Sequence, residues 1–225
     1  AVKTLAWSSN GRQLFTAGEG YTIRKWATKT GEASLDVYSH FHRIQSFDIS
    51  HDCSLVVGST EHAVHLWDAN TTEIFAIPME RKHAFTRMVK LTPDASRILV
   101  GASSQYNPEA TDHNSGYSIE VWDIKSGRLI HTIWGHTHPI SAFSVSQDGS
   151  RFASASAKDG YVRLWDAYIG ALVRSMDHES DVLSAAFSSD GSHIATGTLE
   201  GYIRIWDRAT GKLVLGEVGP CPSMI

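Results

Sequence analysis

Three residue types that together can build a hydrolase nucleophile occur close together in the second half of the chain. They are His136, Asp159 and a serine, which is either Ser154 or Ser156. In a Ser-His-Asp triad the imidazole removes the serine proton, and the carboxylate orients the imidazole. The chemistry requires a serine oxygen that a substrate can reach. These residues are therefore a candidate site whose meaning depends on the elements that carry them.

Histidine is also frequent enough to raise the question of a metal site, with twelve in the chain. The close pairs are His40 with His42, His62 with His65, and His136 with His138. None is joined by a third ligand at a recognised zinc spacing, and the two cysteines do not form a CxxC pair. A Walker loop and a Rossmann glycine pattern are also absent from the sequence. The sequence thus predicts no metal ion and no cofactor.

The composition narrows the class of protein and of partner. The 225 residues are 42% hydrophobic and 20% charged, which excludes a disordered chain. A formal charge of -4 gives no basic field for nucleic acid. No apolar run approaches the roughly 18 residues of a membrane-spanning helix, and the first residues do not resemble a signal peptide. We expect an intracellular protein, cytoplasmic or nuclear, without direct nucleic-acid or membrane contacts.

An internal repeat organises the whole chain. A tryptophan ends an alternating apolar run five times, at spacings of 41, 55, 43 and 41 residues: Trp26, Trp67, Trp122, Trp165 and Trp206. Five residues later stands a glycine in four copies and Thr72 in the second. Upstream, a Ser-x-Asp-Gly turn recurs at Ser146 and at Ser188.

Each repeat is predicted to form four short strands. In the fourth copy these are residues 140–146, 152–156, 161–165 and 172–176, separated by Gly and Asp turns that leave no room for a helix. The six prolines fall in turns, tails or strand ends. The predicted fold class is therefore all-β and repetitive.

These residues resemble the WD40-repeat family, most clearly from Gly135-His136 to Leu164-Trp165-Asp166. The resemblance implies a β-propeller of four-stranded antiparallel blades, with five WD40 repeats in this chain. The expected blades are about 2–38, 41–78, 83–133, 136–176 and 178–216, followed by a tail at 217–225. Since propellers of this family usually have about seven blades, the chain is expected to be part of a longer propeller, with a five-bladed ring or closure by oligomerisation as the alternatives.

The resemblance also implies a structural role for the His136 group. In WD40 blades the histidine, the turn aspartate, a strand hydroxyl and the tryptophan form a buried hydrogen-bonded tetrad, which satisfies the indole N–H. The expected members are His136, Ser154 or Ser156, Asp159 and Trp165; His178, Thr196 or Thr198, and Trp206; and His40, Ser59 and Trp67. Glu200 and Glu61 replace the aspartate in the fifth and second repeats. On this interpretation no residue is catalytic.

The implied function is a noncatalytic scaffold that binds protein or peptide partners, within a larger protein or complex. The alternative is a propeller enzyme or glycan-binding propeller with its site at the channel mouth. About twelve extra residues, Ser104 to Ser115, lengthen the third repeat. This insertion is either a tolerated surface loop or a recognition loop on the face that WD40 propellers most often use for partners. The expected partner-binding residues are Phe41, His42, Phe85, Arg87, Tyr106, Glu109, Asp112 and His138.

Overall fold

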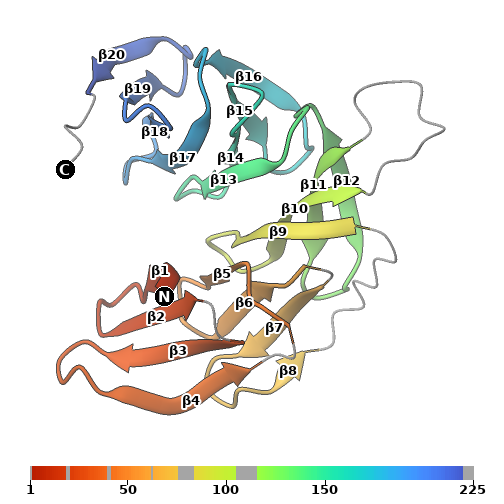
Figure 1. Cartoon of the computed structure of the whole chain (residues 1–225). Helices are drawn as coiled ribbons and strands as arrows, with labels where there is room; N and C mark the ends of the chain where they lie inside the picture. The colour runs from red at the N-terminus through yellow and green to blue at the C-terminus, as the bar shows by residue number, and fades with distance from the viewer. Residues whose placement is uncertain are drawn as a thin grey trace. The chain divides into compact units, whose positions relative to one another are not determined.

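The computed structural model describes residues 2–18, 21–39, 42–61, 63–75, 84–104 and 116–219. In these residues the secondary structure consists of twenty strands in five four-stranded antiparallel sheets (Figure 1). Each sheet uses four strands consecutive in the chain, and each strand pairs with the next one. In the described part of the chain, no helix has the length and apolar character needed to cross a membrane. The all-β prediction is confirmed.

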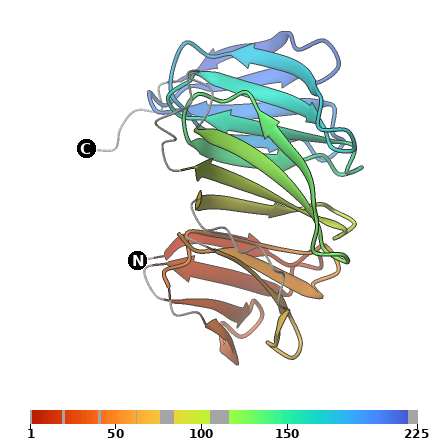
Figure 2. The ribbon, with the colours of Figure 1, turned by 90° about the vertical axis from the view of Figure 1, so that its right-hand side faces the viewer.

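The strands follow one another in the same order in every repeat (Figures 1 and 2). The first two sheets contain β1 (Val2–Trp7), β2 (Gln13–Gly18), β3 (Thr22–Ala27) and β4 (Ala33–Ser39), then β5 (Ser46–Ile49), β6 (Leu55–Ser59), β7 (Val64–Asp68) and β8 (Ile74–Phe75). The third contains β9 (Ala84–Leu91), β10 (Arg97–Ser104), β11 (Tyr117–Asp123) and β12 (Leu129–Trp134). The last two contain β13 (Ile140–Val145), β14 (Arg151–Ser156), β15 (Tyr161–Asp166) and β16 (Leu172–Asp177), then β17 (Val182–Phe187), β18 (His193–Thr198), β19 (Ile203–Asp207) and β20 (Leu213–Val218). Strand β20 continues two residues into the expected tail, because Val218 pairs with Ile203 of β19.

The chain divides into two compact units. The first consists of Ala1–Gln105 with Glu120–Ile130, and the second of Tyr106–Ile119 with His131–Ile225. In the second unit, the core packs β13–β16 against β17–β20 through alternate apolar side chains, among them Ala153, Leu164 and Met176 on one sheet and Ile194 and Trp206 on the other. In the first unit, Phe15, Ile23 and Tyr38 pack with Val56 and Trp67 in the same way.

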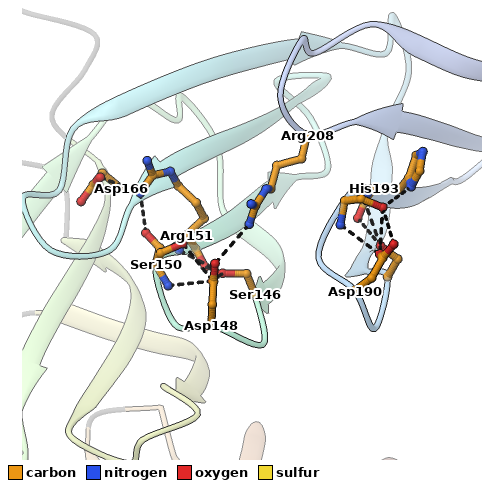
Figure 3. A network of polar contacts seen from close by, with 10 residues as sticks. Ser146, Asp148, Ser150, Arg151, Asp166, Asp190, His193 and Arg208 are labelled. Atoms are coloured by element: carbon orange, nitrogen blue, oxygen red, sulfur yellow. Dashed lines mark hydrogen bonds and ion pairs between the residues drawn. The ribbon is translucent and has the colours of Figure 1, made fainter.

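The turn between the first two strands of each repeat has one hydrogen-bond pattern. A hydroxyl donates to the Asp or Asn two residues later, from Ser8 to Asn10 at 2.9 Å and at 2.6 Å in the pairs Ser50–Asp52, Thr92–Asp94, Ser146–Asp148 and Ser188–Asp190. Figure 3 shows the last two turns. The bond from Ser146 holds the pKa of Asp148 well below its usual range. These local bonds explain why the Ser-x-Asp pattern recurs in the sequence.

The aspartate after the tryptophan closes the turn between the third and fourth strands. Asp166 Oδ1 accepts the amides of Tyr168 and Ile169, and Asp207 Oδ1 accepts both the amide and the hydroxyl of Thr210. The glycine that follows has φ of +72° at Gly31, +66° at Gly127, +69° at Gly170 and +70° at Gly211. In the second repeat Thr72 adopts the same left-handed conformation, with φ of +61°.

Thr72→Gly is therefore expected to stabilise the protein by about 1 kcal/mol, because left-handed backbone costs a residue with a Cβ about 1–2 kcal/mol. Urea unfolding followed by circular dichroism measures the difference. The matched control is Gly31→Thr, whose added Cβ would meet nothing within 4 Å. It should destabilise by a similar amount, and a Thr72→Gly midpoint at or below that of the parent would contradict the prediction.

Candidate functional site

A chain of hydrogen bonds joins four side chains of the fourth repeat. His136 Nδ1–H donates to Asp159 Oδ2 at 2.6 Å, and the Ser154 hydroxyl donates to His136 Nε2 at 2.7 Å. The indole N–H of Trp165 donates to Ser154 Oγ at 2.7 Å. The register β14–β15 places Ser154 beside the tryptophan, because Phe152 pairs with Trp165 and Ser154 lies two residues further along the same face. Each donor in this chain therefore has an acceptor.

The carboxylate at the end of this chain is held by further donors. Asp159 Oδ1 accepts the Tyr161 amide at 3.0 Å, and Oδ2 accepts Arg163 Nη1 at 2.8 Å. Burial alone would raise the pKa of Asp159, but the bonds from His136, the Tyr161 amide and Arg163 together outweigh it and lower that pKa. Burial lowers the pKa of His136 despite the opposing effect of the Asp159 carboxylate. We infer an ionised aspartate and a neutral histidine.

Arg163 Nη1 also lies 2.6 Å from His136 Nδ1. That nitrogen cannot accept a hydrogen bond while its own hydrogen points to Asp159, so we interpret this approach as a contact imposed by the carboxylate that both groups share.

Hydrogen bonds connect serine to histidine and histidine to aspartate in the same sequence as in a hydrolase triad. The serine oxygen that would react, however, is buried. Ser154 is 0% exposed and His136 is 2% exposed. Ser154 Oγ already donates to the imidazole and accepts from Trp165. A nucleophile must approach a substrate carbonyl directly, which this oxygen cannot do without opening of the sheet. Among the described residues no group of three or more His, Cys, Asp and Glu side chains is placed to hold a metal ion.

The fifth repeat has the same chain without the carboxylate. Thr196 Oγ1 lies 2.7 Å from His178 Nε2 and accepts the Trp206 indole at 3.1 Å. His178 Nδ1–H donates to the Met176 carbonyl at 3.2 Å, and burial lowers the pKa of His178 to about 4. Glu200 is exposed. The turn from Thr198 to Tyr202 is one residue shorter than the turn from Ser156 to Tyr161, so the expected position of the acid is lost.

Ser156 and Thr198 were the alternative hydroxyls. Neither takes part in the hydrogen bonds that link the histidine to the tryptophan in the fourth and fifth repeats. Thr198 Oγ1 accepts the amide of Tyr202 at 3.2 Å. The corresponding amide in the fourth repeat, that of Tyr161, donates to Asp159 instead. As a result the buried Ser156 hydroxyl has no hydrogen-bond partner among the described residues. The longer turn thus gives the histidine a carboxylate at the expense of Ser156.

The second repeat differs from the prediction, because Ser59 does not occupy the hydroxyl position. Gly58 is the residue two positions after the partner of the tryptophan, since Val56 pairs with Trp67. A Cβ at Gly58 would lie 2.9 Å from the Trp67 ring. Ser59 lies on the opposite face of β6, and its hydroxyl donates to the Ser46 carbonyl at 3.4 Å. His40, the expected histidine of this repeat, lies outside the described residues.

Two tryptophan acceptors were not predicted. Trp26 Nε1–H donates to Thr16 Oγ1 at 2.8 Å, and Trp122 Nε1–H donates to Glu120 Oε2 at 2.9 Å. Thr16 has the same register as Ser154, because Leu14 pairs with Trp26. Aligning the second strands of the repeats would have identified it. Glu120 precedes its tryptophan by two residues in the same strand, and no repeat signal points to it.

The structure describes only some of the expected partner-binding residues. His138 is half-buried, and its ring stacks on Tyr117 with centroids 6.4 Å apart and planes at 12°. His42 is exposed. Phe85 and Arg87 lie on β9, with side chains that are not described, and Phe41, Tyr106, Glu109 and Asp112 lie outside the described residues. Strand β10 ends at Ser104 and β11 begins at Tyr117, so the insertion joins these two strands.

Comparison with known proteins adds a family and three relatives. The family model described as WD domain, G-beta repeat matches residues 1–27, 127–166 and 170–207. Autophagy-related protein 16 of Arabidopsis thaliana is 30% identical over 147 residues, which are 65% of this chain and 26% of that protein. Periodic tryptophan protein 2 of the same plant is 27% identical over 204 residues, and its Dictyostelium discoideum homolog 26% over 206. Each of these two alignments covers 88% of this chain and 21% of the relative, so the chain spans about a quarter of its relatives' length or less.

Proposed function

We propose that this chain, which belongs to the WD40-repeat family, is a noncatalytic scaffold that binds protein or peptide partners within a larger assembly. The binding face is the end of the sheets that carries the histidine-bearing turns. In the second unit this end consists of residues 135–139, 156–161, 177–181 and 198–202, which we call the histidine-turn end.

The enclosure of Ser154 carries the proposal. The residues that could have formed a hydrolase triad are hydrogen-bonded to one another and to the tryptophan indole. These bonds favour a structural role over a catalytic one. The neighbouring turns are connected as well, since the His178 amide donates to the Gly160 carbonyl at 2.9 Å. Exposed turns on a rigid sheet framework are well suited to presenting a fixed surface to a partner.

The relatives are much longer proteins, of which this chain covers about a quarter or less. One of them is named for autophagy and two for periodic tryptophans. We propose that this chain, like other WD40-repeat proteins, acts inside the cell, in the cytoplasm or nucleus, as one component of a multiprotein complex.

Replacing residues 105–115 with a short Gly-Ser turn is expected to reduce partner recovery about tenfold, since a few anchor residues such as Tyr106 carry most binding energy. Stability should change by less than about 0.5 kcal/mol, because surface loops tolerate changes of length. Affinity capture from cell extract measures partner recovery, and urea unfolding midpoints measure stability.

A variant with the same eleven residues in scrambled order is the control for loop length and composition. It should lose the partner as the deletion does. Saturable recovery that is equal for the parent and both variants would show that the insertion does not contact the partner, and the absence of any saturable partner would contradict the scaffold function.

A further inference from the structure

Three turns at the histidine-turn end form one continuous surface of the second unit. The turn before β15 meets the turn before β17 through the bond from the His178 amide to the Gly160 carbonyl, and a Cβ at Gly160 would lie 3.7 Å from the Ser180 carbonyl oxygen. The turn before β17 meets the turn before β19, because the Leu199 amide donates to the Asp181 carbonyl at 2.9 Å. Residues separated by about 20 positions in the sequence are therefore neighbours on this surface.

An apolar side chain is exposed on the last of these turns. Leu199 is 62% exposed, and Tyr202, which begins the following segment, is half-buried. The corresponding residue of the fourth repeat is Ala157, a much smaller side chain. A single exposed leucine is ordinary on a protein surface, so the choice of an occupant depends on what surrounds it.

The surrounding charges are strongly unbalanced. Asp177, Glu179 and Glu200 are exposed and Asp181 is half-buried, and among the described residues no ion pair neutralises any of them. Of the nearby basic side chains, the two arginines already bind groups of the protein itself. Arg163 is bound to Asp159 at 2.8 Å, and Arg204 Nη1 donates to the His178 carbonyl at 2.8 Å. Lys158 is the exposed base on these turns in the described chain.

We propose that this surface, comprising Asp177, Glu179, Asp181, Leu199, Glu200 and Tyr202, binds a basic segment of a partner protein in which lysine or arginine residues flank an apolar one. The apolar side chain packs on Leu199 and Tyr202, and the basic side chains pair with the carboxylates. The inference rests on the proposed function, because it specifies the chemistry of the partner that the scaffold binds.

The test uses fluorescein-labelled peptides and fluorescence anisotropy with the full chain. A peptide of alternating lysine and leucine should bind saturably, a lysine-serine peptide about fivefold more weakly because it buries no leucine, and a glutamate-leucine peptide should not bind. The double variant Glu179→Lys with Glu200→Lys should weaken lysine-leucine binding about tenfold, since each reversal replaces an attraction by a repulsion. The same variant should gain binding of the glutamate-leucine peptide.

The matched control is Glu32→Lys with Glu73→Lys, which changes the net charge by the same amount at exposed turns of the first unit. It should bind the peptides as the parent does. Leu199→Ser should weaken binding of the lysine-leucine peptide about fivefold and leave binding of the lysine-serine peptide unchanged. Unfolding midpoints confirm that each variant is folded.

Equal loss in the two double variants, or no binding of the lysine-leucine peptide by the parent, would overturn the inference. Either result leaves partner recovery by the chain untouched, so the scaffold function would stand. Conversely, peptide binding mapped to Glu179 and Glu200 without any saturable partner in extract would sustain this surface and contradict the proposed function.

Discussion

Trp165→Ala is expected to lower the free energy of unfolding of its sheet by about 3–5 kcal/mol for lost packing, since large aromatic side chains in a core contribute about that much. Trp165 is 2% exposed, and its ring stacks on Phe152 with centroids 6.3 Å apart. The substitution also removes the donor to Ser154, which leaves a buried polar group short of a partner at a further cost of about 1–3 kcal/mol. Urea unfolding at neutral pH measures the total.

Trp26→Ala is the matched comparison and should cost less. Trp26 is half-buried and donates only to Thr16, with no histidine or carboxylate beyond it in the described chain. Because the two tryptophans lie in different compact units, hydrogen exchange of β14 and of β2 should be recorded beside the global transition. Trp165→Phe keeps most of the packing and loses only the donor. If Trp165→Ala and Trp26→Ala lower stability equally, the hydrogen-bonded chain adds nothing beyond packing.

Stability should fall as the pH is lowered from about 6.5 to about 4, because His178 is buried in its neutral form. Its pKa in the folded protein is about 4 against an ordinary value of 6.5. Above pH 6.5 neither state binds the proton and the group has no effect. Below 6.5 the unfolded chain is protonated while the folded chain is not, so unfolding becomes easier by about 1.4 kcal/mol per pH unit, or about 3 kcal/mol in all.

Urea midpoints of the parent and of His178→Gln across this range test the prediction. The variant should be less stable at pH 7, where it loses the bond to Thr196, but its stability should depend less steeply on pH. His136 contributes in the same direction, because burial also lowers its pKa. His51→Gln, in an exposed turn of the first unit, controls for the substitution itself. A parent and a His178→Gln variant with the same pH slope would contradict the buried neutral histidine.

The sequence by itself determined the repeat, the strands and the turns, because the interactions that specify them are local. A hydroxyl and a carboxylate two residues apart close the turn from Ser146 to Asp148, and a glycine supplies the left-handed residue after Asp166. Such patterns act within a few residues and remain readable in one dimension. The grouping of the histidine, aspartate and tryptophan of the fourth repeat was instead an expectation from the resemblance to the WD40-repeat family, which those residues carry.

The tertiary structure decided which hydroxyl joins them and which residues share a surface. Side chains point to alternate faces along a strand. Ser59 lies one residue beyond the position that faces Trp67, so its side chain is on the opposite face of β6 and Gly58 lies beside the tryptophan. The choice of Ser154 over Ser156 likewise depends on the pairing of β14 with β15. Leu199 and Asp181 become neighbours only because two turns meet through the hydrogen bond from the Leu199 amide to the Asp181 carbonyl. Strand register and contacts between turns are long-range properties, and residue types alone do not encode them in a form that a single sequence reveals.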